Sequence, residues 1–283
     1  MYNDEPLRET FARLARCGYD AVELKGELAH YSVAEVNHLR AEFGLAVSSI
    51  LGWSIWPIPG RDLADTDPAE RAVAVRYIRD CVDFASASAA PVVIVLPFPA
   101  GRTAPLSQPK NETEFLAAAA EEWQNAVASV KEAAAYAAQK GVTLAIEPIN
   151  RFETYQIITV DDALRFLAEV DAENVGINLD AFHMNIEEPN PAEAVRKAGG
   201  KLVHMHAADS NRMPPGRGHT NFRAILTAMA EVGFQGTMIL EPVPPGADPG
   251  LAIQTKAYKT IKETYAEESI RYLNQLEEAL AAV

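Results

Sequence analysis

Two acidic residues lie at the ends of predicted strands, where a carboxylate can bind a metal ion or transfer a proton. Glu147 and Glu241 each follow a short apolar run and precede a proline, in Thr-Leu-Ala-Ile-Glu-Pro and in Thr-Met-Ile-Leu-Glu-Pro. Such a run predicts a buried strand, and the proline, which has no N–H for a strand ladder, indicates that the strand ends there. A carboxylate at the end of a buried strand costs free energy unless a cation or a metal pairs with it. The repeated ending therefore indicates an active site.

Two further predicted strands end in residues that bind metals. Asp180 ends Gly-Ile-Asn-Leu-Asp, and His206 ends Val-His-Met-His. With the two glutamates, three carboxylates and one imidazole suit Mn²⁺, Co²⁺ or Mg²⁺, whereas zinc usually has more nitrogen or sulfur ligands. A single acid at a strand end commonly caps a helix or pairs with an arginine, but four such ends in one chain favour a metal site. His204 lies one layer deeper and is interpreted as a core histidine.

The elements that would position these residues alternate along the chain. Several predicted helices end in a glycine that is followed by an apolar strand, as at Gly18, Gly44 and Gly141, and glycine readily adopts the left-handed conformation that closes a helix. The pattern predicts strands at residues 20–25, 46–52, 91–97, 142–147, 175–180, 201–207 and 236–241. It predicts helices at residues 5–17, 33–43, 68–88, 112–140, 160–171, 191–198, 221–232 and 252–278.

The alternation, unbroken by any linker, predicts a single α/β domain over residues 1–283. Eight helices indicate a (β/α)₈ TIM barrel, in which chemistry takes place at the carboxyl ends of the strands. The first strand of such a barrel is missing, or is vestigial at Met1-Tyr2. A doubly wound open sheet is the alternative fold, although no glycine-rich phosphate loop supports it.

Composition narrows the classes of function. The net charge of −14 opposes binding to nucleic acid, which depends on cations that meet phosphates. No apolar run approaches the length of a membrane span, and the start of the chain lacks a signal-peptide pattern. The two cysteines, Cys17 and Cys81, have no metal-type spacing, so we expect a reduced, cytoplasmic protein.

Several segments resemble the xylose-isomerase-like barrel superfamily and are most similar to its ketose 3-epimerases of the tagatose and psicose type. They are Ile-Glu-Pro-Ile-Asn-Arg-Phe-Glu-Thr, Leu-Asp-Ala-Phe-His-Met-Asn, His-Met-His-Ala-Ala-Asp-Ser-Asn-Arg, Pro-Gly-Arg-Gly-His and Leu-Glu-Pro. The resemblance covers most of the chain and is strongest over residues 141–242. It implies that a divalent metal ion, with Mn²⁺ favoured, is held by Glu147, Asp180, His206 and Glu241.

The resemblance also implies a reaction and its substrate contacts. The two glutamate ligands would exchange the proton on the carbon beside a ketone, and Glu153, His183 and Arg212 would contact a small sugar. Members of the group often form homo-oligomers, so a dimer or tetramer is expected. One scaffold hosts several reactions, so three alternatives stay open: a lyase, dehydratase or decarboxylase acting on a keto-sugar or keto-inositol, an apurinic-site endonuclease, and a non-catalytic sugar-binding subunit.

Other residues have two interpretations each. Trp53 and Trp56 could form an apolar wall against a sugar or pack within their loop. Pro97-Phe98-Pro99 and the polar residues to about 110 could form a lid or an ordinary loop. Arg217 and His219 could bind a phosphate or acid group or lie in a solvated turn.

Overall fold

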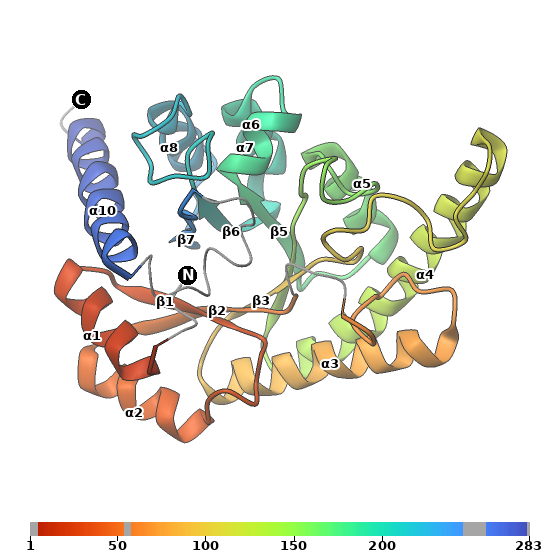
Figure 1. Ribbon diagram of the computed structural model, residues 1–283, viewed down its shortest axis with the longest axis horizontal. Coiled ribbons are helices and arrows are strands. Elements are labelled where there is room, and N and C mark those ends of the chain that lie inside the picture. Colours follow the sequence, from red (N-terminus) through yellow and green to blue (C-terminus); the bar gives the residue numbers. More distant parts are fainter. Residues whose placement is uncertain (1–4, 54–57, 246–258, 282–283) are drawn as a thin grey trace. The chain divides into compact units, whose positions relative to one another are not determined.

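The computed structural model describes residues 5–53, 58–245 and 259–281. Helices and strands alternate along these residues (Figure 1). The strands are β1 (Ala21–Lys25), β2 (Ala46–Leu51), β3 (Val92–Val95), β4 (Thr143–Ile146), β5 (Val175–Asp180), β6 (Leu202–Ala207) and β7 (Thr237–Leu240). The helices are α1 (Leu7–Cys17), α2 (Val33–Phe43), α3 (Pro68–Ala87), α4 (Glu112–Gln139), α5 (Val160–Val170), α6 (Ala181–Glu187), α7 (Pro191–Ala198), the 3₁₀ turn η1 (Gly199–Lys201), α8 (Phe222–Glu231) and α10 (Lys259–Ala281).

The sheet keeps the order of the sequence, from β1 through to β7. The registers that link β2 to β3, β3 to β4, β4 to β5, and β6 to β7 are all parallel. Every residue of β3 is buried, which is typical of a parallel strand covered on both faces. The carboxyl ends of β2, β3, β4 and β5 consequently lie along one edge of the sheet, and those of β6 and β7 lie together likewise.

The ends of the helices form as their local sequences predict. The Ser32 hydroxyl accepts the Glu35 N–H at the start of α2, and Thr159 and Asp162 form a reciprocal capping box at the start of α5. Gly18 and Gly44 close α1 and α2 with φ of 86° and 70°, the left-handed region that favours glycine. Gly18 and Gly44 thus set where α1 and α2 stop before β1 and β2 begin.

The described residues pack as two compact units. The first lies within residues 1–22, 31–47 and 179–283, and the second comprises residues 23–30 and 48–178. In the second unit, α3 and α4 lie side by side (Figure 1), and Trp123 of α4 stacks on Phe98 with 6.3 Å between ring centroids. In the first unit, α7 lies against α8.

The predicted elements agree with the structure apart from one helix and several boundaries. The sequence did not predict α6, and β2, β3, β4 and β7 end one or two residues earlier than expected. The first described helix is α1, while the suggested Met1-Tyr2 strand and residues 252–258 of the predicted last helix lie outside the described residues. Within the described ranges, none of the helices combines the length and apolar character that crossing a membrane requires.

Candidate metal centre

Three of the predicted ligands converge within the first unit. Asp180 is the last residue of β5, His206 lies near the end of β6, and Glu241 directly follows β7. Parallel pairing sets Ala207 opposite Leu240, and the Glu241 N–H donates to the Ala207 carbonyl at 3.0 Å. One ligand atom from each side chain, Asp180, His206 and Glu241, lies within 4.8 Å of the other two.

The environment of these three side chains fits a divalent cation. Asp180 and His206 are fully buried, and the Glu241 side chain is 22% exposed. The His206 Nδ1 lies 3.6 Å from the Glu241 Oε2. Buried carboxylates need a positive partner, and two carboxylates with one imidazole suit Mn²⁺, Co²⁺ or Mg²⁺. These residues can therefore hold such an ion.

Arg212 supplies positive charge to the same cluster. Its guanidinium donates to Oδ2 of Asp180 and to Oε2 of Glu241, and it lies over the Phe182 ring at 4.8 Å from the centroid. Arg212 has a φ of 60°, unusual for a residue with a side chain, and backbone bonds to Asp209 and Val243 hold it there. Arg212 was predicted to contact substrate, and in the structure it contacts the predicted ligands.

Asp180 has two functions in the structure because its two oxygens face different partners. Oδ1 accepts the Phe182 N–H at 2.8 Å and so caps α6, while Oδ2 faces Arg212. Burial alone would raise the pKa of Asp180, but the charge of Arg212 and the nearby imidazoles outweigh it and hold the pKa at about 2. One oxygen of Asp180 thus makes the cap and the other the arginine pair that a strand-end acid commonly makes, and the function of Asp180 as a metal ligand stays a prediction.

His183 is carried into this cluster by α6. It is buried, and its Nε2 lies 3.5 Å from Oδ2 of Asp180. Burial lowers the pKa of His183 to about 4, with Asp180 opposing the shift and Arg212 adding to it. A neutral imidazole can donate from one nitrogen and accept at the other, which suits contact with a hydroxyl group.

Glu147 belongs to the second unit. It follows β4 directly, is 1% exposed, and its N–H donates to the Val95 carbonyl at 3.3 Å. Parallel pairing sets Ile146 opposite Ile177 of β5, so β4 and β5 end at the same edge of the sheet. The function of Glu147 as a fourth ligand stays a prediction.

The other predicted substrate contacts of the second unit lie in loops that follow its strands. The Glu153 carboxylate accepts from the Asn150 side chain at 2.8 Å. Trp53 packs against Leu96, Ala100 and Ile149, which belong to the loops after β3 and β4, and its contact with a sugar stays a prediction. Trp56 lies outside the described residues.

Two further sequence hypotheses concern loops. In the 97–110 segment, Phe98 is buried and meets the Tyr155 ring edge-on at 5.8 Å. The Arg217 guanidinium pairs with Glu268 at 2.8 Å, and the His219 Nδ1 lies 3.1 Å from the Ser210 hydroxyl. Phe98 is thus part of the core, and Arg217 and His219 have partners within the chain.

Sequence reasoning gave no function to Asp209, which shapes the loop that carries Arg212. Asp209 is fully buried, and its carboxylate accepts the N–H groups of Ser210 at 2.7 Å, Gly216 at 2.8 Å and Thr220 at 3.0 Å. Burial opposes ionisation, but hydrogen bonds from the N–H groups of Thr220, Ser210 and Gly218 lower the pKa of Asp209. An acid two residues after a strand, followed by glycines, is the signal that could have identified this loop.

Asp209→Asn is expected to lower the free energy of unfolding at neutral pH by about 2–3 kcal/mol, because an amide replaces a charged acceptor of several N–H groups. The fold lowers the pKa of Asp209 below its ordinary value of about 3.9. The carboxylate thus stabilises the fold above that pH, and the stabilisation is lost as the pH falls through the folded-state pKa. Urea unfolding should show this loss of unfolding free energy at neutral pH and a smaller loss in acid. Asp171→Asn, at an exposed position, is the control. A deficit that does not change with pH would contradict the assignment.

Known proteins resemble this chain over most of its length. The profile of the family described as "Xylose isomerase-like TIM barrel" matches residues 11–276. The chain is 32% identical to a D-psicose 3-epimerase of Ruminiclostridium cellulolyticum, over 81% of this chain and 76% of that protein. It is 28% identical to a 3-dehydro-D-guloside 4-epimerase of Escherichia coli, over 88% of this chain and 91% of that protein.

The solved structures agree with the sequence relatives. A D-psicose 3-epimerase from Clostridium cellulolyticum H10, solved with D-tagatose, matches with a TM-score of 0.82 and 26% identity, over 97% of this chain and 96% of that one. The predicted TIM-barrel class and the predicted resemblance to ketose 3-epimerases are both confirmed. The chain belongs to the xylose isomerase-like TIM barrel family.

Proposed function

We propose that this enzyme, a sugar epimerase by its relatives, inverts the carbon beside the ketone of a free ketose with the help of a divalent metal ion, Mn²⁺ by preference. The observation that carries the proposal is the convergence of Asp180, His206 and Glu241 within 4.8 Å of one another. Relatives named for epimerisation at carbon 3 support the choice of reaction and substrate class.

In the proposed site, Glu147 completes the ligand set with Asp180, His206 and Glu241. Its place in the chain supports this, since it directly follows β4, and the parallel neighbour of β4 is β5, the strand that ends in Asp180. A bound divalent ion would polarise the ketone and stabilise negative charge that develops on the substrate oxygens.

The glutamates carry the proton in this proposal. One carboxylate removes the proton from the carbon beside the ketone, and the electrons of that C–H bond form the C=C bond of an enediolate. The second glutamate, which starts as the protonated carboxylic acid, then gives its proton to the opposite face of that carbon. This step inverts the configuration of the carbon and restores the ketone. Which of Glu147 and Glu241 acts as base depends on the configuration of the substrate.

The remaining polar residues would hold the sugar. The neutral His183 suits a hydroxyl group, because its lowered pKa leaves it one donor and one acceptor. Arg212 and Glu153 are proposed to hold other hydroxyl oxygens, with Trp53 against the apolar face of the sugar. The enzyme is further proposed to act as a cytoplasmic homo-oligomer, and the free thiols of Cys17 and Cys81 are consistent with a reducing compartment.

The proposal is tested by incubating the Mn²⁺-loaded protein in heavy water with a panel of ketoses and keto sugar acids. We expect deuterium at the carbon beside the ketone, together with a new epimer. Exchange at carbon 4 instead would move the reaction toward that of the 4-epimerase relative, and release of a fragment would indicate a lyase. Metal-bound protein that exchanges no proton with any of these sugars would contradict the proposal.

A further inference from the structure

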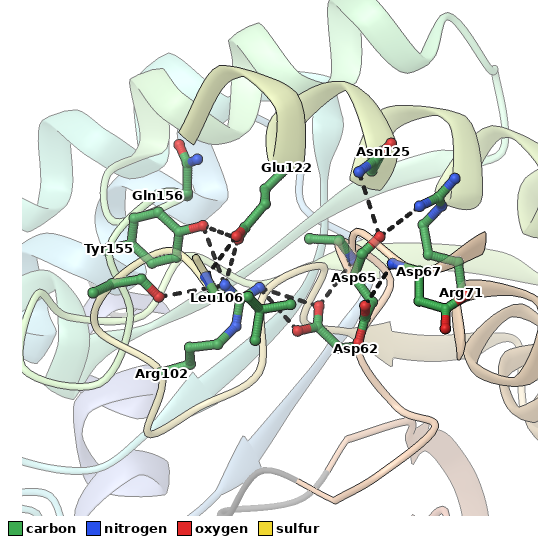
Figure 2. A network of polar contacts seen from close by, with 12 residues as sticks. Asp62, Asp65, Asp67, Arg71, Arg102, Leu106, Glu122, Asn125, Tyr155 and Gln156 are labelled. Atoms are coloured by element: carbon green, nitrogen blue, oxygen red, sulfur yellow. Dashed lines mark hydrogen bonds and ion pairs between the residues drawn. The ribbon is translucent and has the colours of Figure 1, made fainter. Parts of the chain in front are cut away.

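A buried charged cluster in the second unit has no function in the chemistry described so far. It consists of Asp62, Arg102, Glu122 and Tyr155, and we call it the Arg102 cluster (Figure 2). The side chains of Asp62, Arg102 and Glu122 are 13%, 10% and 1% exposed. Burying three charged groups costs free energy unless each has partners, so the contacts within the cluster decide what it does.

Arg102 is the centre of the cluster. Its guanidinium donates to Oε2 of Glu122, to the Tyr155 hydroxyl at 3.2 Å, and to Asp62, whose Oδ2 lies at 2.9 Å. The Tyr155 hydroxyl in turn donates to Glu122. Burial raises the pKa of Tyr155, and its bond to Glu122 adds to the shift, so the phenol stays protonated. Glu122 also accepts the Leu106 N–H at 2.7 Å.

These contacts join three loops that leave the same edge of the sheet. Asp62 lies between β2 and α3, Arg102 between β3 and α4, and Tyr155 between β4 and α5. Because β2, β3 and β4 are parallel neighbours, all three loops start at their carboxyl ends, where barrel enzymes place substrate. Figure 2 shows the three loop residues turned toward one another beneath Glu122 of α4.

The same loops carry the proposed sugar contacts of this unit. Gly101, next to Arg102, donates its N–H to the Glu153 carbonyl at 2.7 Å, with a φ of 86° that favours glycine. Glu153 is therefore held between the Gly101 contact and the Arg102 contact to Tyr155. Trp53 packs on Leu96 and Ala100 of the loop that carries Arg102.

Only an arginine can make this set of contacts. Its planar guanidinium presents five N–H donors in a fixed geometry and can bond acceptors on several segments at once. A lysine has one charged nitrogen on a flexible chain, so it would satisfy one carboxylate and leave the others short of partners. The identity of residue 102 therefore sets the relative placement of the three loops.

We propose that Arg102 is a positioning residue for substrate binding, which fixes the loops after β3 and β4 so that Glu153, and Trp53 packed on Leu96 and Ala100, face the sugar. Arg102 itself touches neither substrate nor metal ligands in this proposal. The inference rests on the proposed function for its kinetic consequence, but its structural consequence, the ordering of residues 99–106 and 150–157, can be measured without any substrate.

The kinetic test compares Arg102→Met and Arg102→Lys with a matched control. The control is Arg79→Met, which removes an arginine that also lies over a tyrosine ring, Tyr136 at 4.3 Å, and near a glutamate, Glu132 at 3.9 Å. Arg102→Met is expected to raise KM for the ketose by about tenfold to a hundredfold, since small misplacements of binding groups have effects of that size. The KM of Arg102→Lys should lie between those of the wild type and Arg102→Met. Arg79→Met should have the wild-type KM.

Metal affinity separates positioning from general loss of the fold. Arg102→Met is expected to bind Mn²⁺ with wild-type affinity, because Asp180, His206 and Glu241 lie in the first unit, and Glu147, the proposed fourth ligand, directly follows β4 and precedes the loop residues 150–157. Adding Glu122→Gln to Arg102→Met removes the carboxylate left without its cation, so the double variant should be no worse than Arg102→Met alone. Wild-type KM in Arg102→Met, or effects of the two substitutions that simply multiply, would overturn the inference.

Hydrogen exchange tests, independently of activity, whether Arg102 orders the two loops. Peptides covering residues 99–106 and 150–157 should exchange faster in Arg102→Met than in the wild type, while a peptide covering β6 should not change. Unchanged exchange in both loops would overturn the inference even if the wild type is an active epimerase. Faster exchange in a protein whose wild type acts on no sugar would instead sink the proposed function and leave the positioning of these loops standing.

Discussion

Glu147→Gln and Glu241→Gln are each expected to lower the turnover of a ketose by about 10²–10⁴, the range that general acid–base catalysis supplies. An amide has nearly the shape of the carboxylate but does not accept a proton at neutral pH. Because one glutamate removes the proton and the other returns one, both variants should lose net epimerisation. The measurement is the rate of epimer formation together with deuterium incorporation in heavy water.

The two variants should differ in which substrate still exchanges its proton. With a given epimer, the variant that retains its base can still wash deuterium into the starting sugar, while the variant that lacks its base cannot. The opposite epimer should reverse this pattern. The exposed Glu121 of α4 provides the control Glu121→Gln, and full epimerase activity in either site variant would remove that glutamate from the proposed pair.

Asp180→Asn is expected to weaken Mn²⁺ binding by at least about a hundredfold, since changes even in the groups around metal ligands cost 10–100-fold. The amide keeps an oxygen that can accept the Phe182 N–H and cap α6, so the helix should still form. It loses the charge that balances Arg212 and that would bind the ion. Calorimetric titration measures the affinity directly.

Thermal unfolding gives a second readout that needs no substrate. An ion that binds only the folded protein raises its melting temperature. Mn²⁺ should therefore raise the melting temperature of the wild type and leave that of Asp180→Asn unchanged. Asp171→Asn is a suitable control, because Asp171 is exposed at the end of α5 with a φ of 51° that asparagine also tolerates. Wild-type affinity in Asp180→Asn would remove Asp180 from the ligand set.

Local patterns in the sequence were enough to predict every described strand and all the described helices except α6 and the turn η1, in the right order. Most of the described helices begin at a side-chain cap and several end beside a glycine, as α2 does at Ser32 and Gly44, and the buried strands are short, mostly apolar runs. The strand-end acids and the histidine were visible for the same reason, because a polar residue directly after an apolar run needs only its neighbours to be recognised. The short helix α6 was missed because its cap, Asp180, was interpreted only as a ligand.

The contacts between distant residues were decided by the tertiary structure. Nothing near Arg212 in the chain indicates that it pairs with Asp180 and Glu241, and nothing near Arg102 indicates Glu122 or Tyr155 as partners. The sequence by itself determined which residue types stand at the strand ends. The fold determined which of them are in contact. Buried charged groups need oppositely charged partners, and these partners lie tens of residues away in the sequence, so no local pattern identifies them.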